Sequence, residues 1–188
     1  MSTSTQNRLE SRYVGITLHG EPHALSAWLV VALRFVIGGM MLFAGLGKYT
    51  LFGGEPFDAG GYLVHGVDSA SPVSGLYATM AESAIMLDVI NVIIPLTQVL
   101  IGIALITGAF VRLAALGGAL QMIAFYLGGW EGEWLALFDS TLVYAVVFLA
   151  VAAFGAGRIL GLDAYIERLK VGGVPLVERW PRLRWLLG

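Results

Sequence analysis

Four long apolar segments restrict the fold of this chain more than any other feature of its sequence. They cover residues 27–47, 89–107, 113–129 and 138–155, and each is about 17 to 21 residues long. Roughly 20 helical residues cross a hydrocarbon core about 30 Å thick. Because lipid offers no water to open backbone groups, the sequence predicts an all-α integral membrane protein whose four helices form a bundle.

The composition fits a membrane protein and limits its chemistry. Of the 188 residues, 57% are hydrophobic and 13% are charged, and there is no cysteine. The lack of cysteine excludes disulfides, iron–sulfur clusters and thiolate metal sites. His19, His23 and His65 lie outside the apolar segments, so neither a bis-histidine haem nor a metal site is predicted. Phosphate-binding loops, nucleophile elbows and basic stripes for nucleic acid are also missing from the sequence.

Lysine and arginine residues are distributed unevenly between the connecting segments. One set of connections carries nearly all of them: Arg8, Arg12, Arg112, Arg158, Arg168, Lys170, Arg179, Arg182 and Arg184. The other set is acidic, with Lys48 as its cation. The positive-inside rule then places both termini in the cytoplasm of a multi-pass protein of the plasma membrane. The first 24 residues are too polar for a signal peptide, so we expect an uncleaved N-terminus.

This distribution divides the chain into three parts. We expect a cytoplasmic N-terminal segment (1–26), a domain of four transmembrane helices (27–157) and a cytoplasmic amphipathic and basic tail (158–188). The outer loop from Tyr49 to Asp88, roughly 40 residues, is either a lid or docking surface or a loosely ordered loop, with a helix predicted near residues 73–83. In the tail, residues 162–171 predict a short amphipathic helix at the membrane interface, and Trp180 and Trp185 are typical of anchoring.

Arg34 lies inside the first apolar segment, where a charge is costly. Insertion of an arginine at the bilayer centre costs at least about 2.5 kcal/mol. Counted from the cytoplasmic ends of their segments, Arg34, Gln98 and Gln121 share a depth of roughly 10 to 15 Å. This group can hold the carbonyl oxygens of a quinone head. The alternatives are a hydrogen-bond network that joins three helices and an arginine that extends to the nearer interface.

A second polar group is predicted at the outer ends of the segments. It consists of Lys48, Asp88, Asn91, Tyr126, Trp130, Trp134 and Asp139. In one interpretation, Lys48 pairs with Asp139 or Asp88 at the mouth of a cavity. In the other, Lys48 offers its charge to a small anion and the tryptophans belong to the interfacial aromatic belt. Repeated glycines in the segments, such as Gly38–Gly39 and Gly117–Gly118, also predict close helix packing.

Several motifs resemble those of one membrane protein family. Residues 34–48 read R-x3-G-x4-F-x-G-x-x-K, the second segment and its exit contain Gly102, Gly108 and Arg112, and residues 155–163 read G-A-G-R-I-L-G-L-D. Together, over about residues 27 to 167, these motifs resemble the DoxX/DoxD family of four-helix membrane proteins. Its DoxD branch is the small-subunit type of thiosulfate:quinone oxidoreductase. The chain has Gln98 where many relatives carry glutamate.

The resemblance implies a membrane subunit of a quinone-linked oxidoreductase, with electron transfer from thiosulfate to quinone as the reaction. Quinone is then the cofactor, held by Arg34, Gln98 and Gln121, and an outer pocket for the anion is formed by Lys48, Asp88, Tyr126 and Asp139. Expected partners are the bilayer, other membrane or peripheral redox subunits and a second copy of the chain. The alternative is a non-catalytic scaffold or assembly subunit of a larger redox complex; a transporter or channel is a third class. The sequence assigns no catalytic residue and leaves open whether the chain is an enzyme.

Overall fold

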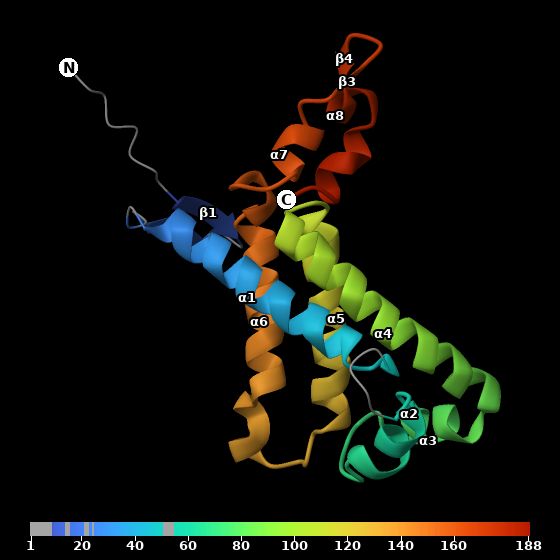
Figure 1. Cartoon of the computed structure of the whole chain (residues 1–188). Helices are drawn as coiled ribbons and strands as arrows, with labels where there is room; N and C mark the ends of the chain where they lie inside the picture. The colour runs from blue at the N-terminus through green and yellow to red at the C-terminus, as the bar shows by residue number, and fades with distance from the viewer. Residues whose placement is uncertain (1–8, 14–15, 21–22, 24, 51–54) are drawn as a thin grey trace.

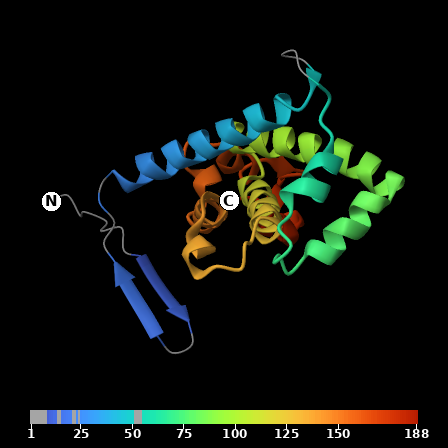
Figure 2. The same ribbon diagram turned by 90° about the horizontal axis from the view of Figure 1, so that it is seen from below.

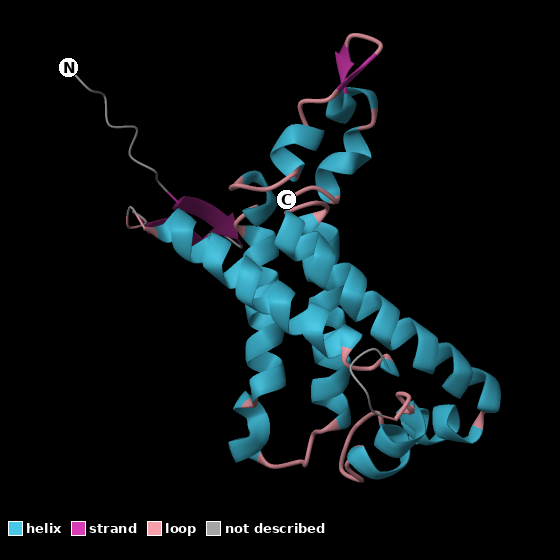
Figure 3. Ribbon diagram, viewed as in Figure 1, coloured by secondary structure: helices cyan, strands magenta, loops and turns pink. Residues whose placement is uncertain are grey.

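The computed structural model describes the chain except for residues 1–8, 14–15, 21–22, 24 and 51–54. The described part is mostly helical, and its strands form two short hairpins (Figure 3). Within it, three helices are long and apolar enough to cross a membrane: α1 (Ser26–Leu46), α4 (Ala84–Thr107) and α5 (Val111–Gly128). A further apolar helix, α6 (Ser140–Ala153), has 14 residues. The prediction of a helical protein with membrane-length apolar helices is confirmed, whereas the hairpins depart from the all-α prediction.

Helix boundaries follow local capping signals. α4 begins at Ala84 instead of Val89 because the Ser83 hydroxyl accepts a hydrogen bond from the backbone N–H of Met86 (3.4 Å). Asp88 therefore lies inside α4. α6 begins after Asp139, whose carboxylate accepts a hydrogen bond from the N–H of Leu142 (2.8 Å).

α1 and α4 pack against each other as an antiparallel pair, in contact through glycines (Figure 1). A Cβ atom added to Gly102 of α4 would lie 2.5 Å from the backbone nitrogen of Leu42. A Cβ atom added to Gly45 of α1 would lie 2.8 Å from the backbone nitrogen of Val99. The two backbones thus approach closely, as small residues allow in membrane helices.

α5 and α6 form the second helix pair. The ring of Phe148 on α6 is fully buried and lies over Gly118 of α5, where an added Cβ atom would come within 2.5 Å of the ring. The buried core includes Ile37, Met41, Ile101, Leu105, Met122 and Phe148, together with valines and alanines from all four helices. The four helices are therefore organised as two tight pairs.

The two pairs are close at one end and diverge at the other. α4 and α5 are joined by a short link in which Gly108 and Phe110 both have positive φ (74° and 52°), and from there α4 leans away from α5 (Figure 1). The segment with α2 (Ala59–Gly61), η2 (Tyr62–Gly66) and α3 (Ser74–Glu82) fills the space between their far ends (Figure 2). The helix predicted near residues 73–83 is present as α3.

The chain termini carry the strands. An antiparallel hairpin of β1 (Leu9–Tyr13) and β2 (Ile16–Gly20) precedes α1. After α6 follow the short turns and helices η4 (Ala156–Arg158), α7 (Asp163–Ile166), α8 (Leu176–Arg179) and η5 (Pro181–Trp185), with a hairpin of β3 (Lys170–Val171) and β4 (Val174–Pro175) between α7 and α8.

The predicted amphipathic helix over residues 162–171 is wrong in its extent, since α7 stops at Ile166. Gly172 and Gly173 both have positive φ (65° and 85°), which is the geometry of a tight two-residue hairpin turn. The chain therefore reverses where the periodicity indicates a continuing helix.

Candidate functional site

Arg34 is fully buried and is bound by backbone carbonyl groups. Its Nη1 donates to the carbonyl oxygens of Ala156 (2.6 Å) and Ile159 (3.0 Å), and its Nη2 donates to that of Leu160 (3.0 Å). These three acceptors belong to the turn after α6. The guanidinium group therefore fastens α1 to the segment that follows α6, while its Nε has no hydrogen-bond partner among the described residues.

The structure does not bring Arg34 together with Gln98 and Gln121, which corrects the predicted polar layer. Arg34 lies beside Gly108, where an added Cβ atom would be 3.0 Å from its Nη1. Gln98 lies about 15 Å further along α4. The depth estimate fails because the first turns of α1 extend past the end of α4: Arg34, more than two turns into α1, lies beside Gly108, the C-cap residue of α4.

Asp163 is a second buried charge at this end, and sequence reasoning gave it no role. Its Oδ1 accepts a hydrogen bond from the N–H of Phe110 (2.6 Å), and its Oδ2 accepts from those of Val111 (3.0 Å) and Gly188 (3.0 Å). The carboxylate thus occupies the N-terminus of α5, where a negative charge is favourable. Its one sequence signal was its place at the end of the 155–163 motif.

Lys48 and Gln98 form the other polar centre. The Lys48 ammonium donates to Gln98 Oε1 (2.9 Å) and to the carbonyl oxygen of Ala44 (3.2 Å), and it lies 5.3 Å from the centroid of the Phe57 ring. This arrangement replaces the predicted ion pair with Asp139 or Asp88. Burial of Lys48 lowers the pKa of its ammonium group below the usual value.

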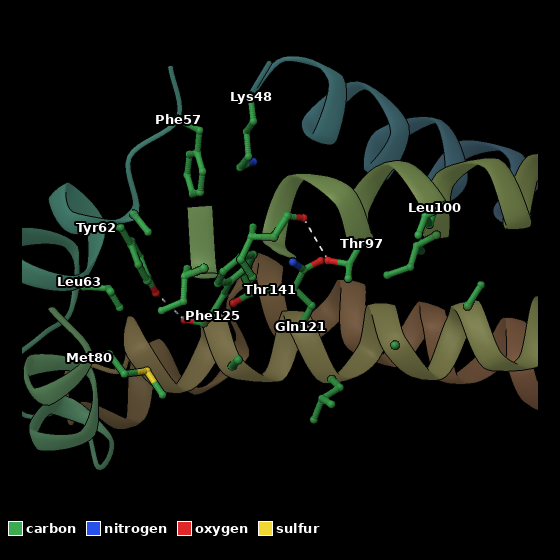
Figure 4. Close-up of a pocket in the computed structure, with 18 of the residues that line it drawn as sticks. Lys48, Phe57, Tyr62, Leu63, Met80, Thr97, Leu100, Gln121, Phe125 and Thr141 are labelled. Carbon is green, nitrogen blue, oxygen red and sulfur yellow. Dashed lines mark hydrogen bonds between the residues drawn. The ribbon is translucent and has the colours of Figure 1, made fainter. Parts of the chain in front are cut away.

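A cavity of about 1040 Å³ lies between α4 and α5, on the side where they diverge (Figure 4). Its wall is mainly apolar, and it includes three predicted site residues: Lys48, Gln121 and Asp139. Lys48 and Gln121 approach it from opposite sides in Figure 4. The cavity is large enough for a drug-sized ligand and has the usual character of such sites, apolar with a few polar groups.

Gln121 is the polar group of this cavity that lacks a partner. Its side chain is 9% exposed, and its Oε1 accepts no hydrogen bond from any residue that the structure describes. A buried amide without partners costs free energy. The unpaired atom is an acceptor, so only an O–H or N–H group could complete it, whereas the amide N–H groups of the same side chain can donate to a ligand carbonyl oxygen.

Two tyrosines close the cavity at the end where α4 and α5 diverge. The hydroxyl of Tyr62 donates to the carbonyl oxygen of Phe125 (3.4 Å), and that of Tyr77 donates to the carbonyl oxygen of Ala124 (2.9 Å). Burial raises the pKa of both phenols. The 59–82 segment is thereby held across the gap between α4 and α5. Sequence reasoning named the loop as a lid candidate but did not single out these tyrosines.

The remaining predicted residues lie outside the cavity. The Tyr126 hydroxyl donates to the carbonyl oxygen of Leu137 (2.9 Å), and its ring packs edge-on against Trp130. Asp88 lies in α4 away from the cavity wall. Among the described residues, no three histidine or carboxylate side chains converge to hold a metal ion.

Comparisons with known proteins add no assignment. No protein-family model matches the chain, and no solved structure matches it. The resemblance to the DoxX/DoxD family therefore stays a prediction that rests on the motif residues.

Proposed function

We propose that this protein is a membrane subunit of a quinone-linked oxidoreductase and that the quinone occupies the cavity between α4 and α5. The observation that carries the proposal is the cavity itself, about 1040 Å³ with an apolar wall that includes two hydrogen-bond donors, Lys48 and Gln121. An isoprenoid quinone has a long apolar tail and a head with two carbonyl oxygens. The apolar wall suits the tail, and polar groups on two sides suit the head.

The donors for the quinone head are Lys48 and Gln121. An ammonium group has three protons, and two of those on Lys48 are used by Gln98 and Ala44, which leaves one for a ligand. The Gln121 amide supplies further N–H donors from the opposite side of the cavity. In this proposal Arg34 has a positioning role only, since backbone carbonyls use its guanidinium group.

The proposed membrane arrangement has four spans. α6 supplies about 21 Å of helix, and the preceding 3₁₀ helix η3 (Trp134–Phe138) adds about 10 Å. Both ends of this unit are fixed to α5, because Arg112 Nε donates to the carbonyl oxygen of Ala152 (3.4 Å) and Tyr126 donates to that of Leu137. These contacts support a four-helix bundle, and the lysine and arginine distribution supports placing both termini in the cytoplasm.

The chain has no cysteine, so electrons must reach the quinone from outside it. Thiosulfate, the donor that the resemblance suggests, would meet a cation at Lys48 by the cavity mouth. The same lack of cysteine favours the second candidate, a scaffold subunit of a larger redox complex, in which a partner carries haem, copper or flavin.

Quinone binding by the purified protein tests the proposal. A short-tailed quinone analogue should bind to protein in detergent, and Gln121→Leu and Lys48→Met should each weaken its affinity by about tenfold, the effect of one lost hydrogen bond of roughly 1.4 kcal/mol. Thr107→Val is the control, since the Thr107 hydroxyl bonds only within its own helix and does not line the cavity. Failure of the unmodified protein to bind quinones would contradict the proposal. The same preparation is then given thiosulfate. Reduction of the quinone would indicate an enzyme subunit, whereas quinone binding without turnover would indicate a scaffold subunit.

A further inference from the structure

The last ten residues combine arginine and tryptophan side chains without an acidic residue. We call residues 179–188, RWPRLRWLLG, the arginine–tryptophan segment. It contains Arg179, Arg182 and Arg184, and both of its tryptophans are exposed, Trp180 by 48% and Trp185 by 76%. Arg179 lies over the ring of Trp180, 5.4 Å from its centroid, whereas the ring of Trp185 is largely exposed.

This segment is fixed at the end of a membrane-length helix. The backbone N–H of Leu113 donates to the carbonyl oxygen of Leu186 (3.2 Å), and Arg112 Nη1 donates to that of Arg184 (3.2 Å). Leu187 is fully buried. Because these contacts involve the first turn of α5, the segment lies where that helix would leave the hydrocarbon and enter the headgroup region (Figure 1).

Apolar side chains lie next to the segment at the start of α5. Phe110 and Leu113 are both partly exposed, and both also line the cavity between α4 and α5. In a bilayer these side chains would contact acyl chains, and tryptophan is the residue enriched at the level just above them. The exposed ring of Trp185, one residue before Leu186, therefore lies near the level at which α5 would leave the hydrocarbon.

The surface of the region after α6, residues 156–188, carries a net positive charge. Residues 156–188 contain six lysine and arginine residues and three carboxylates. Of the carboxylates, Asp163 is buried against backbone N–H groups and Glu167 is paired with Arg158 (2.6 Å). In this range Glu178 is thus the carboxylate left to oppose Arg182 and Arg184.

We infer that the arginine–tryptophan segment binds the headgroups of anionic phospholipids, with Arg182 and Arg184 on the phosphates and Trp185 at the interface. The charge complements an anionic leaflet, and the position at the helix end places the side chains at headgroup level. An acidic protein would satisfy the arginines, but it would leave the exposed ring of Trp185, at the end of a membrane-length helix, without an apolar partner. The inference needs the membrane location of α5 and is independent of quinone binding.

The test uses the full chain in bilayer nanodiscs that contain phosphatidylcholine and phosphatidylglycerol. Either lipid is brominated in turn, because bromine quenches the fluorescence of a tryptophan that it contacts. The difference in quenching between the unmodified protein and Trp185→Phe gives the contribution of Trp185. Mass spectrometry of the intact protein counts the retained phosphatidylglycerol. The paired substitution Arg182→Gln and Arg184→Gln should lower the preference for phosphatidylglycerol by about fivefold for each arginine.

A matched control removes the same charge elsewhere on the tail. Arg168→Gln with Lys170→Gln changes residues at and before the β3–β4 hairpin, which projects away from the helices (Figure 1), and it should keep the preference. Equal loss in the control pair, which would indicate a general surface charge, overturns the inference. So does an unchanged preference in the Arg182/Arg184 pair, or quenching of Trp185 that is the same with both lipids.

Discussion

Single residues show how this chain accommodates charge in an apolar body. Arg34 and Asp163 are both fully buried and are bound by the backbone: Arg34 donates to three carbonyl groups through Nη1 and Nη2, while its Nε has no partner among the described residues, and Asp163 accepts from three N–H groups. A buried charge without such bonds would cost several kcal/mol. The two residues lie near each other at one end of the helices, so their opposite charges are mutually favourable.

Replacing Arg34 should reduce stability while leaving the cavity intact. Arg34→Met removes three charge-assisted hydrogen bonds and should lower the free energy of unfolding in detergent by at least about 3 kcal/mol. Arg34→Lys keeps the charge but lacks the planar guanidinium group, so its free energy of unfolding should lie between those of the unmodified protein and Arg34→Met. Quinone affinity, measured below the unfolding transition, should not change in either variant. A weaker quinone affinity with unchanged stability would indicate instead that Arg34 contacts the ligand.

Lys48 should make ligand binding dependent on pH. Burial lowers its pKa below the usual value of 10.5, so the folded protein loses this proton at a lower pH than the unfolded chain. As the pH rises through the lowered pKa, one donor to the quinone head becomes neutral and the affinity should fall. Over the range between the two pKa values the unfolded state binds more protons, so stability should rise with pH. In Lys48→Met both trends should be absent when binding and unfolding are measured across that range.

At the scale of helices, close packing depends on which face each glycine occupies. Gly102 and Gly45 lie between α1 and α4, whereas a Cβ atom added to Gly39 would meet no described atom within 4 Å. The sequence indicates that small residues favour packing, but the repeat Gly38–Gly39 does not say which member faces the partner helix.

Two alanine substitutions distinguish a glycine packed between α1 and α4 from a glycine on an open helix face. Gly102→Ala would place a methyl group 2.5 Å from the backbone of Leu42, and backbone cannot rotate away as a side chain can. We expect a loss of about 1 to 3 kcal/mol in the free energy of unfolding. Gly39→Ala, the same chemical change on an open face, should be neutral or stabilising by up to about 1 kcal/mol. Thermal unfolding in detergent measures both, and similar losses in the two variants would contradict the packing described for α1 and α4.

The sequence predicts the helices better than it predicts which residues meet. Long apolar runs identify α1, α4, α5 and α6 because hydrophobicity over many residues is a robust signal. The assignment of Gln98 to the Arg34 layer is wrong because it assumes that all helices start at one plane. The tilt and offset of α1 depend on glycine contacts with α4, which are long-range. Asp163 was missed for the same reason, since its partners lie in the link before α5 and at residue 188.

Considered as a whole, the molecule consists of two helix pairs fastened at one end and open at the other. Arg34, Asp163 and the short link after α4 hold the fastened end, while α4 and α5 diverge toward the outer loop (Figure 1). The cavity follows from this geometry. A ligand between α4 and α5 would join the pairs where they share the fewest contacts, so its binding should raise the unfolding temperature, whichever subunit class the protein belongs to.

The number of spans can be tested with single cysteines, because the chain has none of its own. Ser69→Cys and Glu133→Cys lie in the connections at the open end, and Thr17→Cys and Lys170→Cys lie in the two terminal hairpins. If α6 and η3 cross the membrane, a reagent that cannot permeate should label the first two in intact cells and the last two only after permeabilisation. If α6 did not cross, residue 170 would lie on the same side as residue 133 and would be labelled with it. Labelling of Lys170→Cys in intact cells would therefore contradict the four-helix arrangement even if the other three positions behaved as expected.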